Sequence, residues 1–175
     1  LKGGDPLVFA RGGEELEALA AAGVRYEVVP GVTAALGCAA YAGIPLTHRD
    51  LAQTLVMVTG HTRDGRLDLN WRVAADPDIT LVVYMGVRAL GALCAGLIQR
   101  GRAATTPAAL IGNGTYGHQQ VLSGDLGTLP DRLREVELRG PALIVVGAVV
   151  GLQPKLDWFQ KLRRDAGVTL GTAIE

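Results

Sequence analysis

The chain has 175 residues with 17 basic and 17 acidic side chains, and this zero net charge disfavours a nucleic-acid-binding surface that depends on bulk charge. Hydrophobic residues make up 49% and charged residues 19%, which is enough apolar surface for a core and excludes a disordered chain. No apolar stretch reaches the roughly 18 residues that a membrane-spanning helix needs.

The first part of the chain predicts a helix, a strand and a second helix, the pattern of an α/β fold. Acidic residues in a first turn and Gly23 as a stop predict a helix near 13–22. Residues 25–30 are predicted to form a short strand that Pro30 ends. A nearly apolar helix follows over 32–43, and segment 43–53, with Pro45 and a polar cluster, is predicted to be an inter-domain linker.

The second part repeats this alternation. Hydrophobic patterns predict strands at 54–59, 79–85, 107–112, 119–124 and 142–150, with a helix over 87–101 that Gly101 ends. A short helix is predicted over 129–136, with Thr128 as its N-cap and Asp131 completing a capping box. Residues 163–175 have no clear period and are predicted to be a mobile tail.

Cysteine and histidine residues give no metal or disulfide pattern. Cys38 and Cys94 lie far apart in Ala-rich stretches, which predicts buried thiols in a reducing compartment. The three histidines, His48, His61 and His118, lack the spacing and the neighbouring carboxylates of a metal site, and none lies in a nucleophile motif.

A glycine cluster after the 107–112 strand satisfies the dinucleotide spacing G-x-G-x-x-G with Gly112, Gly114 and Gly117. An alternating, strand-like segment follows it instead of a helix, so no helix N-terminus is there to hold a phosphate. A hairpin turn at Asn113-Gly114 is therefore the favoured interpretation, and a dinucleotide site is a third choice for the chain.

Two other clusters, LKGGDP at the start and PGVTAALG at 30–37, also suggest ligand approach. Gly3 and Gly4 permit positive φ and leave the backbone bare, although a tight surface turn explains them equally well. Asp5 either hydrogen-bonds a ribose or an amine, or closes its own turn. Thr33 either caps a helix or contacts a ligand.

Several blocks together resemble one family. They are LKGGDPLVFARGGEE, VVPGVTAALGCAAYAGIPLTHRD, TGH at 59–61, YMG at 84–86, NGT at 113–115 and PALIVVGAVVGL. In this order and spacing, from Leu1 to about Phe159, the chain resembles the uroporphyrinogen-III C-methyltransferases, a branch of the tetrapyrrole methylases that also forms the methyltransferase part of siroheme synthases.

The resemblance implies a two-domain α/β fold whose first domain is incomplete here. Residues 1–46 would be the remainder of the N-terminal domain, 47–160 the C-terminal domain and 161–175 a tail. It further implies a cytoplasmic homodimer that binds a tetrapyrrole. The charge balance, the short apolar stretches and the histidine spacing predict in addition no nucleic-acid, membrane or metal binding.

The family's S-adenosylmethionine contacts carry over to eight positions, all at glycine turns or element ends. These are Gly3, Gly4, Asp5, Val8, Thr33, Ala34, Met85 and Gly114. The best-placed basic residues for a substrate with eight carboxylates are Arg11, His48, Arg49 and His61. Family members carry an Asp and a Lys as acid and base upstream of the LKGGDP block, so neither role is assigned to a residue of this chain.

The implied reaction is S-adenosylmethionine-dependent methylation of uroporphyrinogen III at two ring carbons, which gives precorrin-2 and S-adenosylhomocysteine. This is a step toward siroheme and cobalamin. Two alternatives stay open: a related precorrin methyltransferase, and a fragment that binds S-adenosylmethionine or a tetrapyrrole without catalysis.

Overall fold

A computed structural model describes residues 2–60 and 67–165, and its body is built on one five-stranded sheet. The strands are β1 (Thr54–Thr59), β2 (Ile79–Tyr84), β3 (Pro107–Gly112), β4 (Gln120–Asp125) and β5 (Ala142–Val146). Their order is β1-β2-β5-β3-β4, with β1 and β2 parallel and the other neighbours antiparallel. The five strands predicted after residue 53 are confirmed, although the last one, predicted over 142–150, ends at Val146, and residues 148–152 form a 3-10 turn instead.

Seven helices occur in the described part of the chain. They are α1 (Gly12–Ala21), α2 (Ala34–Ala42), α3 (Trp71–Ala74), α4 (Leu90–Gln99), α5 (Leu129–Arg134), α6 (Gln153–Leu156) and α7 (Trp158–Asp165). Short 3-10 turns, η1 (Val87–Ala89) and η2 (Ala148–Leu152), precede α4 and α6. The predicted α1, α2, α4 and α5 are confirmed, and Gly43 ends α2 in the left-handed conformation (φ 69°).

The sheet is covered on both faces, and β2 shows why. Side chains alternate across a strand, so Leu81 and Val83 enter the core beneath α3, α4 and α5, whereas Val82 and Tyr84 enter the core that includes α2 and η2. Every residue of β2 is buried. Its largely apolar sequence, in which Thr80 is the exception, therefore reflects burial on two sides, and Tyr84 at its end is hydrogen-bonded to Ala35 of α2.

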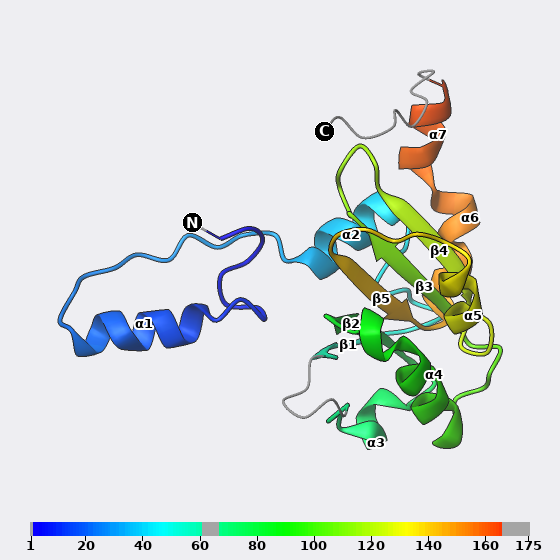
Figure 1. Cartoon of the computed structure of the whole chain (residues 1–175), viewed down its shortest axis with the longest axis horizontal. Coiled ribbons are helices and arrows are strands. Elements are labelled where there is room, and N and C mark those ends of the chain that lie inside the picture. Colours follow the sequence, from blue (N-terminus) through cyan, green and yellow to red (C-terminus); the bar gives the residue numbers. More distant parts are fainter. Residues whose placement is uncertain (1, 61–66, 166–175) are drawn as a thin grey trace.

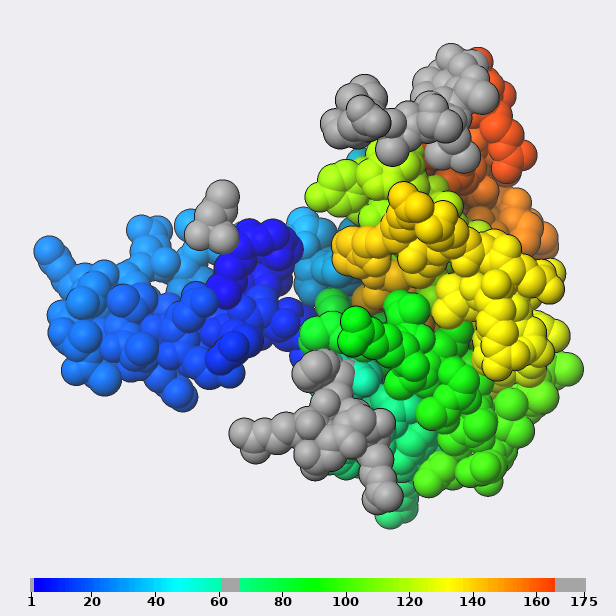
Figure 2. Space-filling model, in the orientation of Figure 1, coloured from blue at the N-terminus to red at the C-terminus, as the bar shows by residue number. Residues whose placement is uncertain are grey.

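Residues 2–33 form an arm that extends from the body. Figure 1 shows α1 and an extended stretch running back beside it, both outside the sheet layers. Figure 2 shows the arm as a separate lobe, which the chain leading into α2 joins to the body and which also contacts the body through Val8 and Phe9. Large apolar side chains on the arm remain exposed, among them Tyr26 (50%), Val29 (76%) and Val32 (66%). An arm of this kind exposes more apolar surface than an isolated domain normally does.

Three local predictions are wrong. Residues 25–30 form no strand, because no described strand lies beside them to complete a hydrogen-bonded ladder. Thr128 does not make a capping box with Asp131: its backbone N–H and its hydroxyl both donate to Asp125, at 2.8 and 2.7 Å. Residues 163–165 of the predicted tail are instead the end of α7, which docks on α2 through Trp158, whose indole N–H donates to the carbonyl of Ala40 at 2.8 Å, and the rest of that prediction lies outside the described residues.

Both cysteines and part of the segment predicted to be a linker are buried. Cys38 and Cys94 are buried free thiols, as predicted, and burial raises the pKa of Cys94 to about 11. In the predicted linker, Ile44, Leu46 and Ala52 are buried in the α2-side core, so this segment is packed against the sheet. None of the helices formed by residues 2–60 and 67–165 has the length and apolar character to cross a membrane.

Candidate functional site

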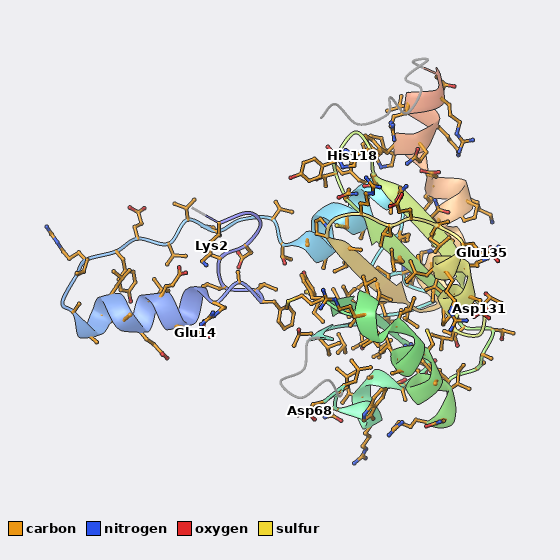
Figure 3. All side chains as sticks on the ribbon, in the orientation of Figure 1. Lys2, Glu14, Asp68, His118, Asp131 and Glu135 are labelled. Carbon is orange, nitrogen blue, oxygen red and sulfur yellow. The ribbon has the colours of Figure 1, made fainter. Side chains whose placement is uncertain are left out.

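Three segments meet around the N-terminal end of α2, a fourth packs along the middle and the C-terminal part of this helix, and we call the four together the junction. They are residues 3–9 of the arm, residues 31–35, residues 84–85 at the end of β2, and the β3–β4 loop at 113–119. Seven of the eight residues that the family resemblance assigns to cofactor binding lie in the first three segments, and the eighth, Gly114, lies in the fourth. Figure 3 places His118 in the fourth segment and Lys2 and Glu14 on the arm.

The first segment is a turn closed by Asp5. The carboxylate of Asp5 accepts hydrogen bonds from the backbone N–H groups of Leu7 (2.9 Å), Val8 (3.1 Å) and Gly31 (3.2 Å). These bonds, that of Leu7 first, lower the pKa of Asp5 below its usual value. Asp5 thus closes its own turn, the simpler of the two roles considered from the sequence, and also ties that turn to residue 31.

Two glycines make the approach between the first two segments possible. Gly4 has φ 82°, a conformation that side chains disfavour. A Cβ on Gly31 would stand 2.2 Å from the carbonyl oxygen of Gly4, so only glycine fits there. No heavy atom lies within 4 Å of the Cβ position of Gly3, which leaves its backbone open to a ligand.

Tyr84 connects the second and third segments. Its hydroxyl lies 2.7 Å from Oγ1 of Thr33 and accepts a hydrogen bond from the backbone N–H of Ala35 at 2.9 Å. The Tyr84 ring also contacts the Phe9 ring, with centroids 4.7 Å apart. Met85, the next residue, has φ 54° and a 53% exposed side chain. One buried tyrosine therefore touches both neighbouring segments of the junction.

The β3–β4 loop is fixed to α2 by close packing and by one buried amide. The chain forms the predicted hairpin, but through residues 113–119 rather than through a two-residue turn. The Gln119 side chain accepts from the N–H of Thr115 (2.8 Å) and donates to the carbonyl of Tyr41 (3.1 Å). A Cβ on Gly114 would stand 2.2 Å from Sγ of Cys38. The position of this loop is set by its contacts with α2.

The predicted substrate-binding residues are more dispersed. Arg11 precedes α1 on the arm with φ 59°, and its Nε lies 3.6 Å from Oε1 of Glu14. His48 is half-buried in a turn closed by its bridge to Ala52, and its Nδ1 accepts from the N–H of Asp50 at 3.2 Å. Arg49 is exposed in the same turn. His61 falls outside the described residues. No hydrogen bond or ion pair within the described ranges connects Arg11 to His48 or Arg49.

Sequence reasoning missed the residues that organise the junction: Tyr84, Phe9 and Gly31. Tyr84 offered one local signal, a hydroxyl at the end of an otherwise apolar buried strand, and such a group needs a partner. Phe9 and Gly31 offered none, because their roles come from contacts with residues remote in the sequence.

The junction presents backbone groups and small side chains instead of a charged cluster. Within 2–60 and 67–165, no group of three His, Cys, Asp or Glu side chains is placed to hold a metal ion. A hollow of about 520 Å³ between the end of α2 and α7 is lined by other residues and does not belong to the junction. The backbone groups and small side chains of the junction suit a small folded ligand that is bound between turns.

Comparison with known proteins points to one group. The sequence model of the Tetrapyrrole (Corrin/Porphyrin) Methylases matches residues 1–130. A siroheme synthase of Pseudomonas aeruginosa (strain UCBPP-PA14) is 55% identical over 166 residues, which is 95% of this chain and 36% of that protein. The chain therefore spans about a third of the length of this relative.

Solved structures of methyltransferases also resemble the chain. Uroporphyrin-III C-methyl transferase from Thermus thermophilus, complexed with S-adenyl homocysteine, has a TM-score of 0.73 and 37% identity, over 85% of this chain and 64% of that one. The cobalt precorrin-4 methyltransferase CbiF has a TM-score of 0.76 and 25% identity, over 84% of this chain and 62% of its own.

Proposed function

Because the chain belongs to the tetrapyrrole methylases, we propose that it is part of an enzyme that methylates uroporphyrinogen III at two ring carbons. The products would be precorrin-2 and S-adenosylhomocysteine. The observation that carries this proposal is the junction: the turn at residues 3–9, the start of α2 and the end of β2 are bonded together through Asp5 and Tyr84. The identity to a siroheme synthase supports the substrate class.

The residues present fit S-adenosylmethionine, which supplies the methyl group when bound. The proposed contacts offer bare backbone and small side chains, with Gly3 open and Met85 exposed. The full proposed set is Gly3, Gly4, Asp5, Val8, Thr33, Ala34, Met85 and Gly114. A sulfonium nucleoside has no pyrophosphate, which agrees with a junction that lacks a phosphate-binding glycine loop before a helix.

Methyl transfer is an in-line displacement, so the protein contributes mainly alignment and exclusion of water. The segments of the junction would orient the cofactor, because their hydrogen bonds and left-handed residues hold the backbone in place before binding. A proton must also leave the alkylated ring, and the base that accepts it is not assigned to this chain.

The polyanionic substrate would be held by basic side chains. Arg11, His48, Arg49 and His61 are the proposed set. Arg11 is exposed at the start of α1 and Arg49 is exposed in the turn after Leu46, which is consistent with solvent-facing cations that meet incoming carboxylates. The chain needs no net positive charge for this, since the interaction is local.

Residues 1–46 are proposed to belong to an N-terminal α/β domain, residues 47–160 to a C-terminal domain and 161–175 to a tail. The exposed apolar side chains of the arm support this division, because other elements of such a domain would cover them. A cytoplasmic location and a homodimer are further parts of the proposal and rest on the family resemblance.

The test is a methyl-transfer assay on the full-length protein with S-adenosylmethionine and uroporphyrinogen III, paired with calorimetric titration of S-adenosylhomocysteine. Methylated product at two ring positions supports the proposal. A product from a later precorrin substrate alone would assign the related activity that the likeness to CbiF suggests. Binding without transfer would make the protein a binding module. If S-adenosylhomocysteine does not bind, the proposed activity, the related precorrin activity and the binding module are all contradicted.

A further inference from the structure

The N-terminal end of α2 is capped by a residue from the sheet. Thr33 has the extended backbone of an N-cap (φ −64°, ψ 150°), yet its side chain makes no capping hydrogen bond. An N-cap side chain normally accepts from an N–H in the first turn. Here the N–H of Ala35 donates to the hydroxyl of Tyr84, 49 positions later in the sequence, at 2.9 Å.

The Tyr84 hydroxyl has a full set of partners. It accepts from the N–H of Ala35 at 2.9 Å, and it shares a hydrogen bond with Oγ1 of Thr33 at 2.7 Å. Sδ of Met57 on β1 lies 3.9 Å from it as a weaker acceptor. Thr33 and Tyr84 are 7% and 9% exposed, so water does not replace these bonds readily. The Thr33 hydroxyl is thereby committed to Tyr84, which leaves the backbone at 33–34 for a ligand.

The same tyrosine restrains the other segments of the junction. Its ring contacts Phe9, which has φ 52° and follows Val8, and its backbone leads directly into Met85 with φ 54°. The left-handed backbone of Phe9 and of Met85 costs conformational free energy, and such residues persist only where the surrounding structure holds them. Tyr84 supplies that restraint to both.

We infer that Tyr84 is a positioning residue: its hydroxyl caps α2 in place of Thr33 and so sets the backbone of Thr33, Ala34 and Met85 for the cofactor. The inference rests on the proposed function. Tyr84 itself need not touch the cofactor, and its effect is transmitted through the residues that do.

The test is Tyr84→Phe in the full-length protein, which keeps the ring contact with Phe9 and removes the hydroxyl. Titration with S-adenosylhomocysteine should show binding weakened about tenfold. In the transfer assay, KM for S-adenosylmethionine should rise by a similar factor, while KM for the tetrapyrrole stays unchanged. A general loss of packing would move both constants.

Tyr41→Phe is the matched control. Tyr41 lies at the opposite end of α2, where its ring packs on Trp158, and loss of its hydroxyl should leave cofactor affinity unchanged. Thr33→Val removes the partner hydroxyl with little change of shape. If the Thr33 and Tyr84 hydroxyls act through their shared hydrogen bond, the double variant should bind S-adenosylhomocysteine as tightly as the single variant of lower affinity.

Amide hydrogen exchange without ligand separates this inference from the proposed function. The N–H of Ala35 should exchange faster in Tyr84→Phe and at the wild-type rate in Tyr41→Phe. Unchanged exchange at Ala35, or unchanged affinity in Tyr84→Phe when the wild type binds, overturns the inference alone. A wild-type protein that binds no S-adenosylhomocysteine overturns the proposed function and the cofactor role of Tyr84 together, and the exchange measurement then still decides the capping role.

Discussion

Gly114 in the β3–β4 loop lies against Cys38 of α2 so closely that a Cβ on Gly114 would stand 2.2 Å from the Cys38 sulfur. The left-handed residues of this loop are its neighbours Asn113 (φ 49°) and Thr115 (φ 72°), not the glycine. Glycine is therefore required at 114 by close approach and not by backbone conformation. Through this contact the loop and α2 fix each other's position.

Replacing Gly114 by Ala should lower the free energy of unfolding by about 1–3 kcal/mol, because the added methyl group overpacks a close contact. Chemical denaturation measures the change. Gly117→Ala in the same loop is the control, since no heavy atom lies within 4 Å of its Cβ position. Adding Cys38→Ala should recover part of the loss. Equal stability of the Gly114 and Gly117 variants would contradict this account.

Replacing Gly4 by Val should weaken S-adenosylhomocysteine binding by about tenfold or more. A side chain at φ 82° costs about 1–2 kcal/mol, and the turn would shift to relieve that strain. Calorimetric titration gives the affinity. Gly13→Ala, exposed on α1 with no heavy atom near its Cβ position, should leave it unchanged. Full affinity in the Gly4 variant would show that this turn does not touch the cofactor.

Asp5→Asn should destabilise the arm in a pH-dependent way. The backbone hydrogen bonds hold the pKa of Asp5 below its unfolded value, so the stabilisation is present above about pH 4 and is lost as pH falls through the lower folded pKa. The difference in Tm between wild type and Asp5→Asn should therefore shrink from pH 6 toward pH 3. Glu17→Gln, exposed on α1, is the control, and a constant difference for Asp5→Asn would refute the linkage.

Arg102→Met should lower the free energy of unfolding by about 1–3 kcal/mol, because it leaves two carbonyls without a donor. The guanidinium of Arg102 is 1% exposed and donates to the carbonyls of Ala74 (3.4 Å) and Ile79 (2.7 Å), which joins the end of α3 to the start of β2. The exposed Arg88→Met is the control and should change stability by less than about 0.5 kcal/mol. Denaturation that moved both variants equally would contradict a specific role for the buried arginine.

The accuracy of sequence reasoning varied with the range of the interactions involved. Strand β2 was predictable because Ile79–Tyr84 carries apolar side chains on both faces, with Thr80 as the exception, and this is a property of the strand itself. The strand predicted at 25–30 failed because a strand exists only with a partner, and no local pattern reports whether one is present. Thr128 had the right residue type for a capping box, but Asp125 on its other side competed for its hydroxyl and its N–H.

For the candidate site, the sequence by itself determined the residue types, the glycine turns and, through resemblance, the family to which they belong. Only the tertiary structure decided how these turns are held, because bonds such as Gly31 to Asp5 and Ala35 to Tyr84 span 26 and 49 positions. A hydrogen bond depends on atoms within about 3 Å. Propensity and periodicity describe neighbours along the chain, so contacts between remote segments arise only when the sheet and α2 have packed together.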